Sequence, residues 1–240
     1  MSWKKVTTGE ETASFLMEKD ARLLESLGED PILHLYRWKG KCATYGHFIK
    51  VEEFLDRKVA QTIGLDLAKR PTGGGIIFHL WDLAFSVLVP SSHPAFSQNT
   101  LDNYAFVNRA VLAAIQELLQ EKHPLELTPV DGVNLGSGCG SFCMAKPTRY
   151  DVMLGEKKVA GAAQRKTRHG FLHQGSISLL SPSFPLLQEV LHEEYVAVLK
   201  AMEAFTYPVL GCGASLKDLE QGRREVEALL EKHLMREMTI

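Results

Sequence analysis

Three consecutive glycines, Gly73–Gly75, are the feature that most restricts how this chain can fold. They follow an extended segment, Leu65–Arg70, and the breaker Pro71-Thr72, and they precede the apolar run Ile76–His79. Glycines adopt backbone conformations closed to other residues and let a ligand approach the main chain. The pattern predicts strand, glycine loop and strand. The loop is either a hairpin turn or a cradle for an anion or an acyl carbonyl, and no Lys-Ser or Lys-Thr follows to make it a P-loop.

The remaining hydrophobic pattern predicts strands and helices along the whole chain. Apolar runs predict further strands at 32–38, 43–45, 83–89, 150–154, 158–163 and 171–179, with 43–45 the neighbour of 32–38. Apolar residues three or four apart predict helices at 10–26, 51–63, 100–122, 185–199 and 215–234, and the glycine-rich stretch 132–140 predicts a loop. We expect one catalytic domain over residues 1–240, with a helical C-terminal segment at about 183–240.

Composition excludes several classes of function. With 45% hydrophobic residues and a net charge of −2, the chain has no global attraction to nucleic acid or anionic membrane, so neither is an expected partner. The residues up to Thr12 lack the apolar core of a secretory signal, and the stretch Ile76–Val89 is too short to span a bilayer, so we expect a cytoplasmic protein. The four cysteines form no CxxC pair and predict reduced thiols and no metal site. We interpret Cys42 and Cys212 as structural, and Cys139 as a loop thiol.

Two blocks of sequence carry a family resemblance. Lys69–His79 reads KRPTGGGIIFH and closely resembles the RRxTGGGxVFHD signature of lipoate-protein ligases and octanoyltransferases. Lys157–Gln164 reads KKVAGAAQ and resembles the KKxAGxAQ segment of that superfamily, and Gly175–Ile177 resembles its HGS/T strand. Tyr36–Trp38 and Tyr45–Phe48 are similar to its Y-x-W and G-Y-F-Q elements. The chain is therefore identified as a member of this superfamily from about residue 10 to at least residue 180.

The resemblance implies an α/β (α+β) fold with a mixed, mostly antiparallel sheet flanked by helices, related to biotin protein ligases and class II aminoacyl-tRNA synthetases. An acyl chain would lie in an apolar tunnel beside the glycine loop. Lys158 would contact the acyl carbonyl and stabilise its negative charge as a tetrahedral intermediate forms, whereas outside the family it would be a solvated turn lysine. The resemblance also implies a set of acyl- or substrate-binding residues: Arg70, Gly73, Gly74, Gly75, His79 and Gly161. A histidine bound only to backbone groups is the alternative for His79.

Cys143 separates the two chemistries of the superfamily. The segment Ser141–Val152 resembles the CFxAPSxYEL segment of the cysteine-dependent octanoyltransferases, in which the aligned cysteine carries the acyl group as a thioester. The ATP-dependent ligases lack that cysteine. A thiolate is a good nucleophile towards a thioester, and a nearby ammonium such as Lys158 would favour the charged form. The alternative for Cys143 is a buried thiol that packs as a small hydrophobic residue.

Three features depart from the family pattern or lie outside it. The FHD of the signature is replaced by Phe78-His79-Leu80, with Asp82 two residues later, so its carboxylate is displaced or absent. The usual QHGS is replaced by His173-Gln174-Gly175-Ser176, which on a strand puts the imidazole on the opposite face. The basic run at 165–168 is either a solvated hairpin tip or a contact for the acidic surface of a lipoyl domain.

Three hypotheses of function follow. The first is a transferase in which Cys143 takes octanoyl or lipoyl from a donor and passes it, without a cofactor, to a lysine of a lipoyl carrier domain, such as the glycine cleavage H protein or a dehydrogenase E2 subunit. The second is a lipoate-protein ligase that uses ATP and Mg²⁺ to activate lipoate as lipoyl-AMP. The third is a non-catalytic protein that binds an acyl group or a carrier. Biotin ligation is disfavoured because the GRGRxxR signature is missing.

Overall fold

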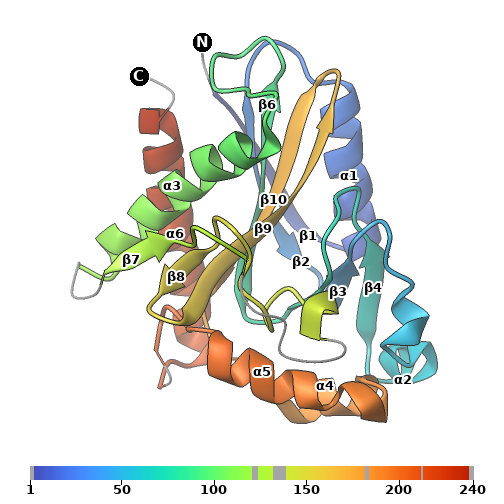
Figure 1. Cartoon of the computed structure of the whole chain (residues 1–240). Coiled ribbons are helices and arrows are strands. Elements are labelled where there is room, and N and C mark those ends of the chain that lie inside the picture. The colour runs from blue at the N-terminus through green and yellow to red at the C-terminus, as the bar shows by residue number, and fades with distance from the viewer. Residues whose placement is uncertain (1–2, 121–123, 132–138, 182–183, 212, 238–240) are drawn as a thin grey trace.

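The computed structural model of the protein describes residues 3–120, 124–131, 139–181, 184–211 and 213–237. Its largest element is a seven-stranded sheet with the order β1-β2-β6-β10-β9-β8-β7 (Figure 1). The strands are β1 (Lys4–Glu11), β2 (Ile32–Trp38), β6 (Asp82–Pro90), β10 (Gly170–Ser178), β9 (Lys157–Thr167), β8 (Val152–Leu154) and β7 (Leu125–Leu127). Only β1 and β2 pair in parallel within this sheet; the other neighbours are antiparallel. The prediction of a mixed, mostly antiparallel sheet is confirmed.

A second, three-stranded sheet has the order β4-β3-β5, with β4 (Leu65–Lys69), β3 (Lys41–Tyr45) and β5 (Ile76–His79). β3 lies in the middle, parallel to β4 and antiparallel to β5. The glycine loop therefore connects the two outer strands across the end of β3, and it is not a hairpin turn. The prediction that 43–45 pairs with 32–38 is wrong, because the fully buried strand β6 takes the place beside β2.

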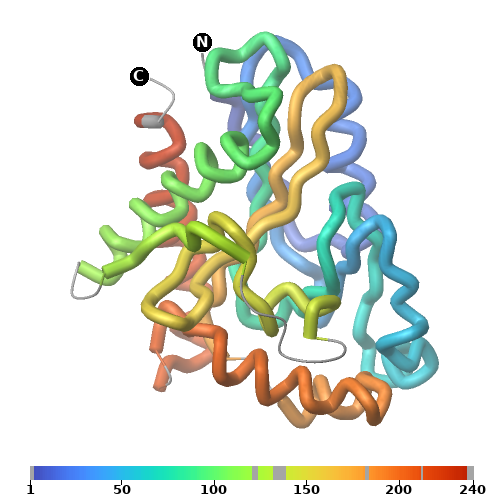
Figure 2. Tube along the Cα trace, viewed as in Figure 1, coloured from blue at the N-terminus to red at the C-terminus, as the bar shows by residue number. Residues whose placement is uncertain are grey.

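Helices cover both faces of the large sheet. The helices are α1 (Ala13–Glu25), α2 (Arg57–Thr62), α3 (Thr100–Leu118), α4 (Phe184–Val190), α5 (Ala197–Phe205) and α6 (Leu216–Glu237). α3 and α6 pack together on one face over the main apolar core, while α1 lies on the other face beside the small sheet (Figure 1). α4 and α5 lie side by side against the small sheet's own core, although 100 or more residues separate them from it in sequence (Figure 2). None of the helices described is long and apolar enough to cross a membrane.

Three local predictions need correction. The helix predicted from residue 10 begins only at Ala13, with Thr12 as its cap, because residues 4–11 form the edge strand β1. No strand was predicted there, since most of its side chains are polar and give no apolar periodicity. The helix predicted over 51–63 is split, because Asp56 caps α2 and leaves only a short 3₁₀ turn (Val51–Glu53) before it. The helix predicted over 185–199 is likewise split between α4 and α5 by the 3₁₀ turn Glu193–Tyr195. Residues 132–138 of the predicted loop lie outside the described residues.

Candidate active site

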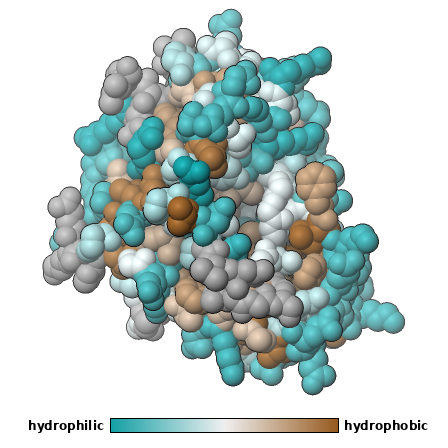
Figure 3. Space-filling view, viewed as in Figure 1, coloured by the Kyte–Doolittle hydropathy of each residue, from teal (hydrophilic) through white to brown (hydrophobic). Residues whose placement is uncertain are grey.

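A cavity of about 490 Å³ opens between the two sheets. Its walls come from the small sheet, the glycine loop, β2, the middle parts of β9 and β10, and the segment that follows the 3₁₀ turn Cys139–Ser141. On the face shown in Figure 3, hydrophilic residues surround a paler middle in which hydrophobic residues are interspersed. The lining includes all the predicted site residues except Gly73: Arg70, Gly74, Gly75, His79, Cys143, Lys158 and Gly161.

The glycine loop is held by backbone contacts that only glycine allows. A Cβ on Gly75 would lie 2.3 Å from the carbonyl oxygen of Ser141, and a Cβ on Gly46 would lie 1.9 Å from the carbonyl oxygen of Gly74. Gly74 has φ +85°, a left-handed conformation that favours glycine. Gly46 thus supports the glycine loop, a role that the sequence reasoning missed, although Gly46 lies within the Tyr45–Phe48 element that carries part of the resemblance.

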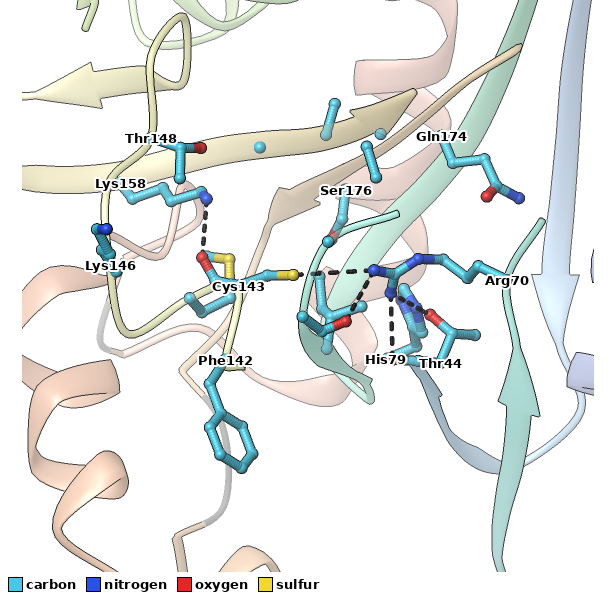
Figure 4. Close-up of a pocket in the computed structure, with 18 of the residues that line it drawn as sticks. Thr44, Arg70, His79, Phe142, Cys143, Lys146, Thr148, Lys158, Gln174 and Ser176 are labelled. Atoms are coloured by element: carbon cyan, nitrogen blue, oxygen red, sulfur yellow. Dashed lines mark hydrogen bonds between the residues drawn. The ribbon is translucent and has the colours of Figure 1, made fainter. Parts of the chain in front are cut away.

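Arg70 ties this loop to the small sheet from inside. Its Nη2 donates to the carbonyl oxygens of Gly73, at 3.0 Å, and Gly75, at 2.8 Å, and its Nη1 donates to the Thr44 hydroxyl at 2.9 Å (Figure 4). The side chain is buried, and within the part of the chain that the structure describes it makes no ion pair. Gly73 therefore does not line the cavity, but its carbonyl accepts a hydrogen bond from Arg70.

Cys143 lies half-buried at the cavity wall, next to the glycine loop. Its backbone N–H donates to the carbonyl of Ile76 at 2.9 Å, which fixes this segment along β5. Its Sγ lies 3.9 Å from Nη2 of Arg70 (Figure 4). The cation nearest to the sulfur in the described contacts is thus Arg70, whereas the sequence had suggested Lys158.

Lys158 reaches the same place from β9. Only 3% of its side chain is exposed, and its Nζ donates to the backbone carbonyl of Cys143 at 2.8 Å and pairs with Oδ2 of Asp151 at 2.7 Å. Burial raises the pKa of Asp151, and the charge of Lys158 opposes that rise. A Cβ on Gly161 would lie 2.5 Å from Nζ, so glycine is what lets the lysine pass. Lys158 is therefore a buried site residue and not a solvated turn lysine, whereas Lys157 beside it is exposed.

Asp151 is a second residue that the sequence reasoning missed as part of the site. It lies in the segment Ser141–Val152, so the same resemblance that pointed to Cys143 could have found it. Its Oδ2 also accepts hydrogen bonds from the N–H and hydroxyl of Thr148, at 2.6 and 2.9 Å. An ammonium carries three N–H donors, and Asp151 and the Cys143 carbonyl take two of them, so the third is left for another acceptor in the cavity.

The carboxylate of Asp82, although displaced in the sequence, contacts His79. Oδ2 of Asp82 lies 2.7 Å from Nδ1 of His79 and 2.6 Å from the Ser176 hydroxyl. Burial alone would raise the pKa of Asp82, but His79, Ser176 and Arg223 together outweigh it and the pKa is lowered, which favours the carboxylate. His79 is thus bound to side chains on both sides rather than to backbone groups, because its Nε2 lies 2.8 Å from the Thr44 hydroxyl.

The exchange of His173 and Gln174 has the predicted effect on β10. Gln174 lines the cavity and holds the Thr72 hydroxyl at 2.7 Å and Asp20 at 2.6 Å, whereas His173 faces the other side, between Phe85 and the ring of Tyr104. Burial lowers the pKa of His173 to about 3. The imidazole of His173 therefore does not line the cavity, and it is neutral at neutral pH.

The buried His173 should make the fold acid-sensitive. Between the unfolded value of about 6.5 and the folded value of about 3, the unfolded chain binds a proton that the folded chain does not, so this group's contribution to stability falls as the pH falls. The slope for one proton is about 1.4 kcal/mol per pH unit. We expect His173→Gln to flatten the plot of unfolding free energy against pH by about that slope between pH 6 and pH 4. Urea titrations of both proteins would measure it, with exposed His47→Gln as the control; parallel plots would contradict the prediction.

The remaining sequence predictions fall outside the cavity. Cys42 is buried in β3, as expected of a structural thiol. Cys139, interpreted as a loop thiol, lies buried at the start of the 3₁₀ turn, and Cys212 lies outside the described residues. The basic run 165–168 forms the β9–β10 hairpin, about 30 Å along β9 from Lys158 at strand geometry (Figure 1). Among the described residues, no group of three or more His, Cys, Asp or Glu is placed to hold a metal ion.

The architecture is that of lipoate-protein ligases. The bi-partite lipoate protein ligase of Thermoplasma acidophilum, reported with its E2 lipoyl domain, matches with a TM-score of 0.73 at 23% identity, over 100% of this chain and 85% of that one. A lipoate-protein ligase A bound with ATP also matches with a TM-score of 0.73 at 23% identity, over 100% of this chain and 87% of that one. At this identity the likeness establishes the fold.

Sequence comparison places the chain more narrowly. Residues 12–208 match the lipoyl protein ligase A/B catalytic domain, and the chain belongs to this family. It is 30% identical over 181 residues to the octanoyltransferase LipM of Anoxybacillus flavithermus, a match that covers 74% of this chain and 65% of that protein. It is 27% identical over 208 residues to the LipM of Staphylococcus aureus, covering 85% of this chain and 75% of that protein. The chain thus spans slightly less than two thirds of the length of some of these relatives.

Proposed function

We propose that this protein is an acyltransferase that carries an octanoyl or lipoyl group on Cys143 and transfers it to a lysine of a lipoyl carrier domain. The observation that carries the proposal is the position of the Cys143 sulfur, which lines the cavity 3.9 Å from a buried guanidinium. The guanidinium is a positive charge beside the sulfur, and an anionic sulfur is the species that attacks an acyl donor. The relatives named octanoyltransferase LipM support the transfer of an octanoyl group.

The reaction would run in two balanced steps. The Cys143 thiolate attacks the carbonyl carbon of a thioester donor, and the donor's thiolate leaves with the electron pair of the broken C–S bond. The neutral amine of the carrier lysine then attacks the new thioester, and Cys143 leaves as a thiolate with the electron pair of its C–S bond. The proton that the amine loses passes through solvent to the thiolate of the donor. In both steps the free N–H of Lys158 would stabilise the carbonyl oxygen as it gains charge. No cofactor is needed for this route, and a cytoplasmic location is part of the proposal.

Intact-protein mass spectrometry tests the proposal directly. The enzyme is incubated with an octanoyl carrier protein, and a lipoyl domain is added afterwards. We expect a hydroxylamine-sensitive octanoyl adduct on Cys143 that disappears as the domain gains the same mass. A parallel reaction contains lipoate, ATP and Mg²⁺ instead. Modification of the domain only in that reaction, with no adduct on the enzyme, would replace the transferase by the lipoate-ligase hypothesis. Acyl binding without turnover in either reaction would favour a non-catalytic protein.

A further inference from the structure

A chain of buried hydrogen bonds runs from the Cys143 sulfur to Asp82. It passes from Arg70 to the Thr44 hydroxyl at 2.9 Å, from Thr44 to Nε2 of His79 at 2.8 Å, and from Nδ1 of His79 to Asp82 at 2.7 Å. Arg70, Thr44, His79 and Asp82 are all less than a tenth exposed. Figure 4 shows Arg70 between Cys143 on one side and Thr44 and His79 on the other.

The donors in this chain all point the same way. A guanidinium only donates, so the Thr44 oxygen accepts from Arg70 and its own proton is free for His79. A carboxylate only accepts, so Nδ1 of His79 carries the proton shared with Asp82 and Nε2 accepts from Thr44. In this arrangement each of the three contacts has one donor and one acceptor, while Nε of Arg70 and Oδ1 of Asp82 are buried without a hydrogen-bond partner among the described residues. Hydrogen bonds aligned in one direction polarise each other. The chain of hydrogen bonds thus has a cation, Arg70, at one end and an anion, Asp82, at the other.

The contacts of Arg70 indicate what this chain of hydrogen bonds does. Nη2 carries the contact to the sulfur, and its other partners are two carbonyls of the glycine loop. Buried charges require a compensating partner, and the described contacts give Arg70 no carboxylate of its own. The carboxylate at the far end of the chain, Asp82, supplies that compensation through two intermediates. His79 is itself held flat by stacking on Trp38, with ring centroids 4.4 Å apart.

We propose that Asp82 and His79 act through Thr44 as positioning residues that hold the Arg70 guanidinium against the Cys143 sulfur. Asp82, the displaced carboxylate of the FHD signature, thus has a positioning role in this proposal. The inference rests on the proposed function for its catalytic meaning, but the placement of a cation beside the sulfur can be measured without any acyl donor.

Thr44 offers the sharpest test, because Thr44→Val removes only the hydroxyl and Thr44→Ser keeps it. Cys143 is alkylated with iodoacetate, which is an anion, and with iodoacetamide, which is neutral, and the modification is quantified on the peptide that contains Cys143. A cation at the sulfur favours the anionic reagent. We expect Thr44→Val to slow alkylation by iodoacetate about tenfold and to lower the ratio of the two rates, while Thr44→Ser stays near the wild-type protein.

Asp82→Asn and Arg70→Gln complete the series. We expect Asp82→Asn to lower the ratio in the same direction as Thr44→Val, and Arg70→Gln to set the lower limit. Circular dichroism of each variant confirms that only folded protein is compared. The proposal is overturned if folded Thr44→Val and Asp82→Asn keep the wild-type ratio, or if Thr44→Ser loses as much as Thr44→Val. If the ratios change as expected but no octanoyl adduct forms on the wild-type enzyme, the positioning role stands and the transferase proposal fails.

Discussion

Cys143→Ala is expected to abolish octanoyl transfer, with a loss of at least about 10³-fold in single-turnover rate. The substitution removes the only sulfur among the described cysteines that lines the cavity, so the two-step route has no acceptor for the first acyl transfer. Stability should change by no more than about 1 kcal/mol, because the side chain is small and half-buried. The rate is measured as the appearance of octanoylated lipoyl domain by mass spectrometry.

The matched control for this experiment is Cys139→Ala. Cys139 is buried four residues away in the same segment, and it does not line the cavity, so its loss should leave transfer within about twofold of the wild type. Full activity of Cys143→Ala would contradict the thioester route and would leave Cys143 a packing residue.

Lys158→Met is expected to reduce the transfer rate about 10² to 10³-fold, because the ammonium that would stabilise the carbonyl oxygen is lost. It should also destabilise the fold by about 3–5 kcal/mol, because Asp151 is left buried without its partner. The two effects can be separated. Adding Asp151→Asn to Lys158→Met removes the unpaired charge, so stability should recover while the transfer rate stays low.

The neighbouring lysine provides the control for Lys158. Lys157→Met changes an exposed side chain at the same hairpin and should shift stability by less than about 0.5 kcal/mol, with no effect on transfer. Denaturant unfolding and single-turnover rates of the four proteins form the complete set. If the double variant recovers activity together with stability, Lys158 has a structural role only.

The sequence predicted the fold best where apolar residues repeat along one face of a helix or run through a buried strand. The helix at 100–122 and the strands at 32–38, 83–89 and 171–179 carry regular apolar patterns, and the structure has elements at each place. The pattern failed at β1, whose side chains are mostly polar, and at the two split helices, where the capping of α2 by Asp56 and the 3₁₀ turn before α5 break a continuous apolar face. Strand pairing was also out of reach, because periodicity describes one strand and not its partner. That residues 1–240 form a single domain stays a prediction.

The candidate site was predicted through family motifs and completed only by geometry. The motifs predicted that Cys143, Lys158, Arg70 and His79 belong to one site. They could not show that the cation in contact with the sulfur is Arg70, whereas Lys158 contacts the backbone carbonyl of Cys143. Gly46 and Asp151 were not recognised because their roles depend on contacts with residues distant in the sequence. Gly46 contacts Gly74, which is 28 positions away, and Asp151 pairs with Lys158, which is seven positions away. Roles that arise from such contacts leave no periodic signal in the sequence. The catalytic and binding roles of these residues stay predictions.

Under the proposed function, the close approach of Gly46 to the carbonyl of Gly74 limits how the cavity could be adapted to other acyl groups. Two stretches of main chain meet there, so a side chain added to Gly46 would collide with the glycine loop. Room for a bulkier or longer tail has to be made at positions that line the cavity with a side chain, such as Met17 or Ile77. Engineering for unnatural acyl probes should therefore begin at these positions and leave the glycine loop untouched.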